Sequence, residues 1–458
     1  MDRKPHVIAI PCAAQSHVAS LVKLAYKLAE HEIKVTFVNA DFVHAKIMAA
    51  LPLEFQQQNQ IRFVSIPDGS ESDDDRNDSI KHNQSILRVM PGHLQNLIEK
   101  INQSGDDEQI TCVIADITAG WALELAMSMS IKRAAFLPAG LGNSALALHI
   151  PKLIESGVID VNGMPIRDEM IVLSKDIPAW SPRNVTWSCP GNPEFQKFLF
   201  QCYSTKVSEY VMISDWTITD SFYELEQPAY NLIPNVLPVG PLTSTRMIHN
   251  PGSFWPEDQT CLSWLDEQPT GSVIYVAFGS LRLFSKQELD ELALGLELVG
   301  QPFLWVVRPQ IMNGMRAEFP DGFMERVADR GKIVEWSSQE KVLCHPSIAC
   351  FLSHCGWNSI MEGLSKGIPF LCWPFFADQL HNRDYICETW KIGLSLSPDQ
   401  HGTVTRHEIE TKIRALISDD AIKANALNLK EMASKSVAAG GSSFKNFQAF
   451  VEQLRSSC

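Results

Sequence analysis

Short apolar runs alternate with amphipathic stretches along the first half of the chain. The runs have the length of strands, and the stretches between them place their apolar residues on one helical face. Strands that alternate with helices in this way pair in parallel. The expected elements are strand 6–12, helix 18–30, strand 33–39, strand 112–116, helix 119–129 and strand 133–137.

The second half repeats this pattern after a stretch rich in proline and glycine, and 458 residues exceed one compact core. We therefore expect an N-terminal domain at 1–240, a linker at 241–260 and a C-terminal domain at 261–458. A last helix near 445–454 is expected to pack back on the first domain. The expected C-terminal elements are strand 272–278, helix 286–299, strand 303–308 and strands near 332–334 and 348–352.

Each half is thus predicted to be α/β and Rossmann-like, with a parallel sheet. Two such domains that face each other bind ligands at the carboxyl ends of their strands. Two long irregular stretches, 69–83 and 178–190, are candidates to shape the mouth of a substrate site.

Composition narrows the class of protein. Hydrophobic residues make up 45% of the chain and charged residues 20%, which is typical of globular proteins. A net charge of −14 without a basic run argues against nucleic acid as a partner. Eleven cysteines without paired short spacings favour reduced thiols, and no apolar run is long enough for a signal peptide or a membrane helix. We expect a cytoplasmic protein without integral membrane association.

The stretch that follows strand 348–352 predicts a phosphate site. It reads Ser353-His354-Cys355-Gly356-Trp357-Asn358-Ser359 and then continues as a helix to Lys366. The first turn of a helix has unpaired N–H groups and a partial positive charge, which suit a pyrophosphate, and Gly356 lets the backbone approach closely.

A longer segment resembles the signature of the plant secondary-product glycosyltransferases, the plant family 1 UDP-glycosyltransferases. It reads Trp336-x-x-Gln339, His354-Cys355-Gly356-Trp357-Asn358-Ser359-x-x-Glu362 and Trp373-Pro374-Phe375-Phe376-Ala377-Asp378-Gln379. Such a match at fixed offsets is far more specific than a lone glycine motif. The resemblance implies a GT-B fold of two facing Rossmann-like domains, the first binding the acceptor and the second a UDP-sugar.

The resemblance also implies a role for each position of the donor segment. Trp336 would stack on uracil, the Gln339 backbone would pair with the edge of that ring, and Glu362 would bind the ribose. A terminal glutamine goes with glucose in this family, so UDP-glucose is the expected donor. The phosphates would be held by His354, Gly356, Asn358, Ser359 and Ser280, and the sugar by the Trp357 backbone, Asp378 and Gln379.

Taken singly, most of these residues have a purely structural interpretation. Ser359 and Glu362 have the spacing of a capping box, Asp378 could cap a helix that begins near Leu380, and a lone Trp336 would usually be core. A dozen landmarks in register favour the donor site over these alternatives.

His17 and Asp116 are the candidates for catalysis. His17 follows the first strand and Asp116 ends a later strand, so both are expected at one sheet edge, and a histidine backed by a carboxylate suits removal of a hydroxyl proton. On position alone, a packing role for His17 is the more economical interpretation. The resemblance implies instead that the two form the family's catalytic dyad. Ser16 and Ser20 depart from the family's glycine and proline beside it.

The function implied is an inverting O-glucosyltransferase that uses UDP-glucose, needs no metal and acts as a monomer. Asp73-Asp74-Asp75 reads as a solvated charge run rather than a metal motif. A flavonoid, phenylpropanoid, terpenoid or hormone-like acceptor would suit the apolar segments around Trp121, Leu141, 180–187 and Phe376, although core packing explains them equally well. Two alternatives remain, a non-catalytic nucleotide-sugar binder and a UDP-sugar hydrolase or epimerase of the same fold.

Overall fold

The protein is described by a computed structural model in which the chain divides into two compact units. The N-terminal unit comprises Met1–Glu169, Gly191–Trp255 and Ser436–Cys458, and the C-terminal unit comprises Met170–Pro190 and Pro256–Lys435. This division differs from the expected one because 170–190 joins the C-terminal unit. The end of the chain joins the N-terminal unit, as expected for the last helix. The described residues are 4–51, 61–71, 76, 78–105, 108–243, 252–309 and 316–456.

The N-terminal unit contains one sheet with the strand order β3-β2-β1-β4-β5-β6-β7, in which all neighbours are parallel. Its central strands β1 and β4 are buried over their whole length, as expected for a sheet covered by helices on both faces. The strands are β1 (His6–Ile10), β2 (Lys34–Ala40), β3 (Arg62–Ile66), β4 (Cys112–Asp116), β5 (Lys132–Leu137), β6 (Trp216–Thr219) and β7 (Val236–Pro238).

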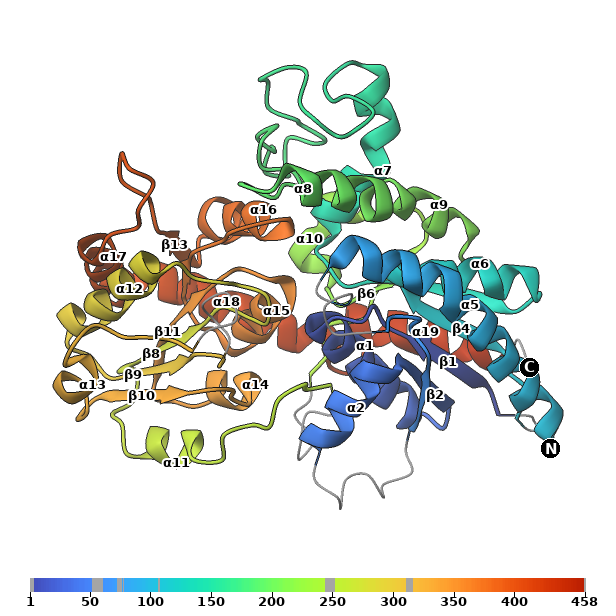
Figure 1. Cartoon of the computed structure of the whole chain (residues 1–458), viewed down its shortest axis with the longest axis horizontal. Coiled ribbons are helices and arrows are strands. Elements are labelled where there is room, and N and C mark those ends of the chain that lie inside the picture. Colours follow the sequence, from blue (N-terminus) through green and yellow to red (C-terminus); the bar gives the residue numbers. More distant parts are fainter. Residues whose placement is uncertain are drawn as a thin grey trace. The chain divides into compact units, whose positions relative to one another are not determined.

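Helices connect these strands and cover the sheet (Figure 1). The C-terminal helix α19 (Ser442–Ser456) belongs to this unit, where it contacts β7 and Phe450 packs edge-on against Trp216 at 5.4 Å. The other helical elements are α1 (Gln15–Ala29), α2 (Asp41–Ala50), α5 (Ser79–Ser104), η2 (Ile117–Ala119), α6 (Trp121–Ser128), α7 (Leu141–Glu155), α8 (Pro193–Leu199), η3 (Phe200–Ser204), α9 (Lys206–Ile213) and α10 (Tyr223–Tyr230).

The C-terminal unit has a second parallel sheet with the order β10-β9-β8-β11-β12-β13. Counted from the first strand of each sheet, both units therefore share the Rossmann order 3-2-1-4-5-6. The strands are β8 (Val273–Ala277), β9 (Phe303–Val306), β10 (Gly331–Val334), β11 (Ile348–Ser353), β12 (Phe370–Cys372) and β13 (Gly393–Ser395).

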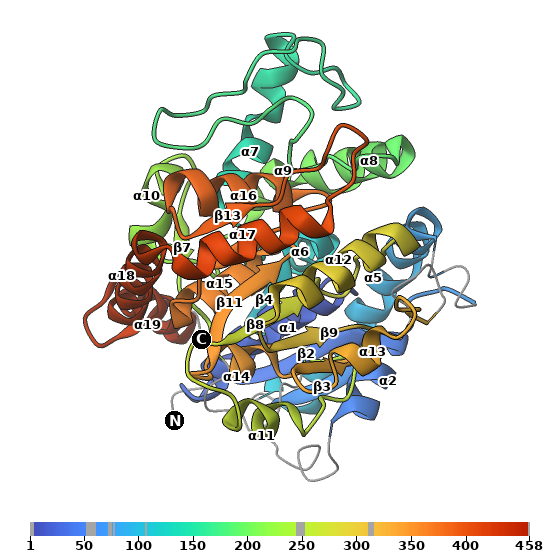
Figure 2. The ribbon, with the colours of Figure 1, turned by 90° about the vertical axis from the view of Figure 1, so that its left-hand side faces the viewer.

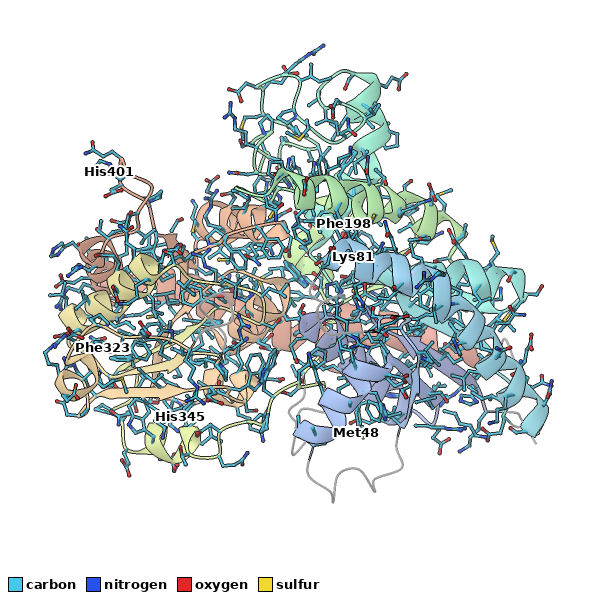
Figure 3. All side chains as sticks on the ribbon, viewed as in Figure 1. Met48, Lys81, Phe198, Phe323, His345 and His401 are labelled. Carbon is cyan, nitrogen blue, oxygen red and sulfur yellow. The ribbon has the colours of Figure 1, made fainter. Side chains whose placement is uncertain are left out.

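Helices α12 (Lys286–Val299) and α17 (Arg406–Ser418) lie side by side over the second sheet (Figure 2). Their contact is close, because a Cβ on Gly295 would lie 2.9 Å from the Ile409 side chain. Phe323, at the edge of the view in Figure 3, belongs to the buried core of this unit. The other helical elements are α11 (Cys261–Asp266), α13 (Phe323–Arg326), α14 (Gln339–Leu343), α15 (Trp357–Lys366), α16 (Asp378–Asp384), η4 (Tyr385–Thr389) and α18 (Asp420–Val437).

The predicted elements of both sheets are present, with small changes at their ends. Strand 112–116 and helix 286–299 have the predicted bounds, and 178–190 contains no helix or strand. The loop expected at 69–83 is shorter, because α5 begins at Ser79, where Asp78 accepts hydrogen bonds from two backbone N–H groups. The acidic run 73–75 lies outside the described residues, as does 244–251 of the expected linker.

Two features bear on membranes and metals. Among the described residues, no helix combines the length and apolar character that a membrane crossing requires. In the same part of the chain, no three side chains of His, Cys, Asp or Glu come together in a way that could hold a metal ion.

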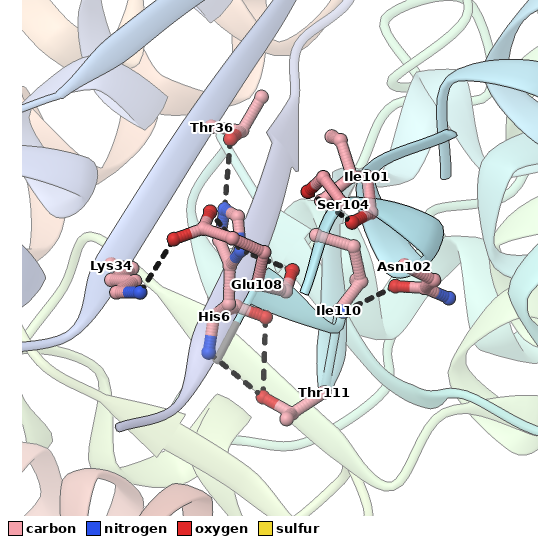
Figure 4. Close-up of polar contacts among 9 residues, drawn as sticks. All are labelled: His6, Lys34, Thr36, Ile101, Asn102, Ser104, Glu108, Ile110 and Thr111. Carbon is pink, nitrogen blue, oxygen red and sulfur yellow. Dashed lines mark hydrogen bonds and ion pairs between the residues drawn. The ribbon is translucent and has the colours of Figure 1, made fainter. Parts of the chain in front are cut away.

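The amino end of β1 shows what a structural histidine looks like in this protein (Figure 4). The buried His6 ring lies 2.8 Å from the Glu108 carbonyl and 2.9 Å from the Thr36 hydroxyl, so both of its nitrogens are paired. Burial lowers the pKa of His6. This ring connects β1, β2 and the segment before β4 at the amino ends of these strands, whereas His17 follows the carboxyl end of β1.

Candidate active site

The N-terminal sheet brings His17 and Asp116 together at the point where its strand order reverses. Strands β1 and β4 are neighbours, with Ile10 paired to Ala115, but their connections leave in opposite directions along the sheet. Asp116 is the last residue of β4, and His17 lies in the first turn of α1, directly after β1. Open α/β sheets bind their ligands at such a switch point.

The two side chains form a fixed pair. His17 Nδ1 donates to Asp116 Oδ2 at 2.7 Å, and Asp116 Oδ1 accepts from the Thr118 backbone at 2.9 Å and from its hydroxyl at 2.6 Å. Asp116 is fully buried, whereas the His17 side chain is 25% exposed. The carboxylate therefore sets the tautomer and orientation of the ring, and a ring that reaches solvent can meet a ligand. The sequence-based placement of this pair is matched by the geometry.

Hydrogen bonds within the N-terminal unit fix the first turn of α1. The Gln15 side chain accepts from the Phe254 backbone and donates to the Gly252 carbonyl, each at 2.7 Å. Ser20 donates from its hydroxyl to the Ser16 carbonyl at 3.0 Å, inside the first turn. The two serines that depart from the family pattern thus fit a regular helix, and His17 keeps its place between them.

The C-terminal sheet repeats this arrangement for the donor segment. Strands β8 and β11 are neighbours at its switch point, and they lead into Gly279-Ser280 and His354-Cys355-Gly356. A Cβ on Gly279 would lie 2.7 Å from His354 Nε2, and a Cβ on Gly356 would lie 2.5 Å from the same atom. The ring is therefore placed between two turns that only glycine allows to approach so closely.

Two buried arginines, which were not predicted from the sequence, lie near this ring. Arg282 pairs with Glu288 at 2.6 Å, and Arg308 donates to the Arg282 carbonyl at 2.6 Å. Burial of the ring, followed by the positive charges of Arg282 and Arg308, lowers the pKa of His354 to about 4. His354 is therefore neutral at pH 7, and the positive charge at this turn comes from guanidinium groups.

Gln339 ties the first part of the donor segment to the helix that follows β11. Its Nε2 donates to Ser359 Oγ and to Glu362 Oε2, each at 2.8 Å, and the buried Tyr275 hydroxyl donates to its Oε1 at 3.3 Å. Tyr275 also lies 3.0 Å from the Ser337 hydroxyl. Because the Gln339 side chain is engaged in this network, any ligand contact at Gln339 falls to its backbone.

The helix-capping interpretations of three donor residues are wrong. Helix α15 begins at Trp357 with Gly356 as its N-cap, so Ser359 and Glu362 lie inside the helix rather than in a capping box. Helix α16 begins at Asp378 itself and has Ala377 as its N-cap residue, so Asp378 lies inside the helix. Because helix capping does not explain these positions, a role in donor binding is favoured for them.

Asn382, which was not predicted from the sequence, connects Asp378 to the turn that carries Cys355. This fully buried side chain donates to Asp378 Oδ2 at 2.9 Å and to the Cys355 carbonyl at 3.0 Å. Gln379 Oε1 accepts from the Phe375 backbone at 3.2 Å, and in the described part of the chain its Nε2 has no protein partner. The only sequence signal for Asn382 was its i+4 spacing from Asp378.

The remaining donor positions have mixed exposure. Trp336 is half-buried and its carbonyl accepts from the Asp258 backbone at 2.9 Å. Ser280 and Asn358 are half-buried, whereas the Trp357 ring is buried, which agrees with a contact through its backbone alone.

The three predicted acceptor-lining residues lie in different surroundings. Leu141 is fully buried and Trp121 is 7% exposed, both within the N-terminal unit, and Phe376 is half-buried in the C-terminal unit beside Phe375. Trp180 and Trp187 are fully buried in the C-terminal unit. An acceptor-lining role for Trp121, Leu141 and Phe376 stays a prediction.

Two Rossmann-type sheets, each with candidate site residues at its switch point, are typical of a nucleotide-binding α/β protein. Comparison with known proteins gives the family. A family model described as UDP-glucoronosyl and UDP-glucosyl transferase matches residues 193–436. UDP-glycosyltransferase 83A1 of Arabidopsis thaliana is 41% identical over 99% of this chain and 97% of its own length. The 7-deoxyloganetic acid glucosyltransferase of Catharanthus roseus is 32% identical over 99% of this chain and 98% of its own.

Solved structures agree on the fold. Os79 from O. sativa in complex with UDP has a TM-score of 0.81 at 25% identity and covers 98% of this chain and 100% of its own. Phytolacca americana UGT2, complexed with UDP-2fluoro-glucose and pterostilbene, has a TM-score of 0.80 at 24% identity over 99% of both chains. The chain belongs to the plant family 1 UDP-glycosyltransferases, enzymes of the GT-B fold that transfer a sugar from a UDP-sugar donor.

Proposed function

We propose that this enzyme transfers glucose from UDP-glucose to a hydroxyl group of a small hydrophobic plant metabolite, with inversion at the anomeric carbon. The observation that carries the proposal is the 2.7 Å bond between His17 and the buried Asp116. It supplies an oriented base at the sheet edge where ligands of this fold bind.

The chemistry follows from the tautomer. Because His17 Nδ1 donates to Asp116, Nε2 is the nitrogen that takes the acceptor's proton while the acceptor oxygen attacks the anomeric carbon. Asp116 then stabilises the imidazolium. A single displacement of this kind converts the α-linked sugar of the donor into a β-glucoside, because the oxygen enters on the face opposite to UDP.

Departure of UDP moves negative charge onto the diphosphate. The N-terminus of α15 carries a partial positive charge, His354 is a neutral donor, and Arg282 and Arg308 add positive charge nearby. These groups support the proposal that the enzyme needs no metal ion to stabilise the leaving group.

The choice of glucose rests on the end of the donor segment. Asp378 is oriented by Asn382, and Gln379 keeps its amide nitrogen for a ligand while its oxygen is bonded to Phe375. A carboxylate and an amide donor suit adjacent sugar hydroxyls. The relative from Catharanthus roseus is a glucosyltransferase by name, which agrees with this choice.

A panel of flavonoid, phenylpropanoid, terpenoid and hormone-like alcohols tests the proposal. The purified enzyme is incubated with UDP-glucose and each acceptor, with and without EDTA, and products are read by mass spectrometry. We expect a monoglucoside in at least one class, at the same rate in both buffers. Release of free glucose without any conjugate would support a hydrolase instead. Binding of UDP-glucose without turnover would support a nucleotide-sugar binder, and activity restored to an EDTA-treated enzyme by manganese would overturn the metal-free mechanism.

A further inference from the structure

Residues 170–190 come from the first half of the sequence but belong to the C-terminal unit. We call this segment the strap. It is closed on itself by two backbone hydrogen bonds between Ile171 and Trp180, at 2.8 and 3.0 Å. Trp180, Val185 and Trp187 are each at most 1% exposed, so the strap is anchored by buried side chains although it contains no helix or strand.

The first contact of the strap is with the residue before Asp378. The Ala377 backbone N–H donates to the Ser188 carbonyl at 2.8 Å. Ser188 is itself fixed, because its hydroxyl accepts from the Val185 backbone at 2.9 Å. Ala377 has φ 52 and ψ −137, a conformation that is strained for a non-glycine residue and persists only where its surroundings impose it. The Ser188 carbonyl is one group that imposes it.

The second contact is with the residue two positions after Gln379. The Trp180 and His381 rings are stacked, with centroids 3.9 Å apart and planes at 18°, and Tyr385 packs edge-on against His381 at 5.0 Å. Trp180 and His381 are each 1% exposed. Burial, with a further contribution from Arg383, lowers the pKa of His381 to about 3, so the stack joins two neutral rings.

The strap therefore holds both sides of one short turn. Ala377 and His381 bracket Asp378 and Gln379, the residues to which the proposed function gives the donor sugar. In addition, Asn382 fixes the Asp378 carboxylate by a hydrogen bond. The uracil, ribose and phosphate positions lie on α14 and α15 and in the turns after β8, β10 and β11, and none of them contributes to the two strap contacts described above.

We infer that Trp180, through His381, and Ser188, through Ala377, position the turn that carries Asp378 and Gln379. They thereby set the preference of the enzyme among UDP-sugars. This inference rests on the proposed sugar contacts of Asp378 and Gln379. It assigns a role in donor choice to a segment from the acceptor half of the sequence. Neither residue touches the donor in this role. A loosened strap weakens recognition of the sugar and leaves recognition of UDP intact.

Trp180→Ala tests the inference by calorimetry and kinetics. An aromatic pair contributes about 0.5–1.5 kcal/mol beyond area burial, which corresponds to a change of roughly two- to tenfold. We expect the ratio of the Kd for UDP-glucose to the Kd for UDP to rise by that factor, with the Kd for UDP unchanged. Selectivity for UDP-glucose over UDP-galactose should fall in parallel. Trp180→Phe keeps an aromatic ring against His381, so it should restore most of the affinity for UDP-glucose and most of the selectivity over UDP-galactose.

Two further variants separate positioning from stability. Trp305→Ala removes another fully buried indole of the same unit, packed on Phe319, and should lower Tm without changing either ratio. Ala377→Gly relieves the backbone strain, so it should raise Tm and still lower the selectivity. The inference is overturned if Trp180→Ala and Ala377→Gly keep the wild-type ratios, or if Trp305→Ala changes them equally. Because the ratios come from binding, they remain measurable if the wild type fails to transfer glucose, so the two failures are distinguishable.

Discussion

Replacement of His17 by alanine is expected to lower kcat/KM for transfer by about 10²–10⁴-fold, which is the usual contribution of a general base. The Kd for UDP should stay at its wild-type value, since the proposed nucleotide contacts lie in the C-terminal unit. Initial rates with saturating acceptor and titration of UDP measure the two quantities. Asp116→Asn should also lower kcat without a change in the Kd, because an amide at this position no longer stabilises the imidazolium.

His31→Ala is the matched control for this prediction. His31 follows the same helix at its other end, where its Nδ1 lies 3.0 Å from the Lys27 carbonyl. It should keep the wild-type rate. Equal rates for wild type and His17→Ala would remove His17 from the mechanism. A loss of UDP affinity as large as the loss of rate would assign His17 to binding instead.

Gly356→Ala is expected to weaken UDP binding by about tenfold or more, equivalent to roughly 1.4 kcal/mol. The new Cβ would lie 2.5 Å from His354 Nε2, and a Cβ on Gly279 would lie 2.7 Å from the same atom, so the ring is packed closely against both turns. Either the ring or the start of α15 must move, and both are proposed phosphate contacts. Titration of UDP into the variant measures the loss.

Gly279→Ala should act in the same direction, because its Cβ would lie 2.7 Å from the ring and its φ of +65 disfavours alanine. Gly92→Ala is the control, since no atom lies within 4 Å of the added methyl group and the position is helical. Wild-type UDP affinity in both Gly356→Ala and Gly279→Ala would show that His354 does not contact the diphosphate. A loss of affinity in Gly92→Ala would show that the effect is not local.

The sequence predicts the two parallel sheets well because their central strands are short, continuous and buried. Strand 112–116 and helix 286–299 have the expected bounds, since a run of apolar residues and a capping box at Ser285 and Glu288 mark them locally. The strap could not be assigned in this way. Its membership of the C-terminal unit depends on contacts such as Trp180 with His381, which join residues far apart in the chain and leave no periodic signal.

The donor segment and His17 with Asp116 were predicted from residue type, order and family resemblance. The structure brings His17 and Asp116 together at a switch point, and hydrogen bonds join Gln339 to Ser359 and Glu362. The supporting residues were not predicted. The side chains of Asn382 and Tyr275 form hydrogen bonds with their neighbours, and Arg282 acts on His354 through its charge. These neighbours are far apart in the sequence, and Arg282 and His354 are separated by 72 positions. Only the folded sheet makes such residues adjacent.

The anomeric configuration of the product tests the central claim most directly. Attack by an acceptor oxygen deprotonated by His17 is a single displacement, so the glucoside formed from UDP-α-glucose must be β. The coupling constant of the anomeric proton, measured by NMR on the conjugate before any exchange, decides between the two configurations. A β-glucoside is the predicted result. An α-glucoside would contradict the account, because it requires a second displacement or a front-side mechanism that gives His17 and Asp116 a different role.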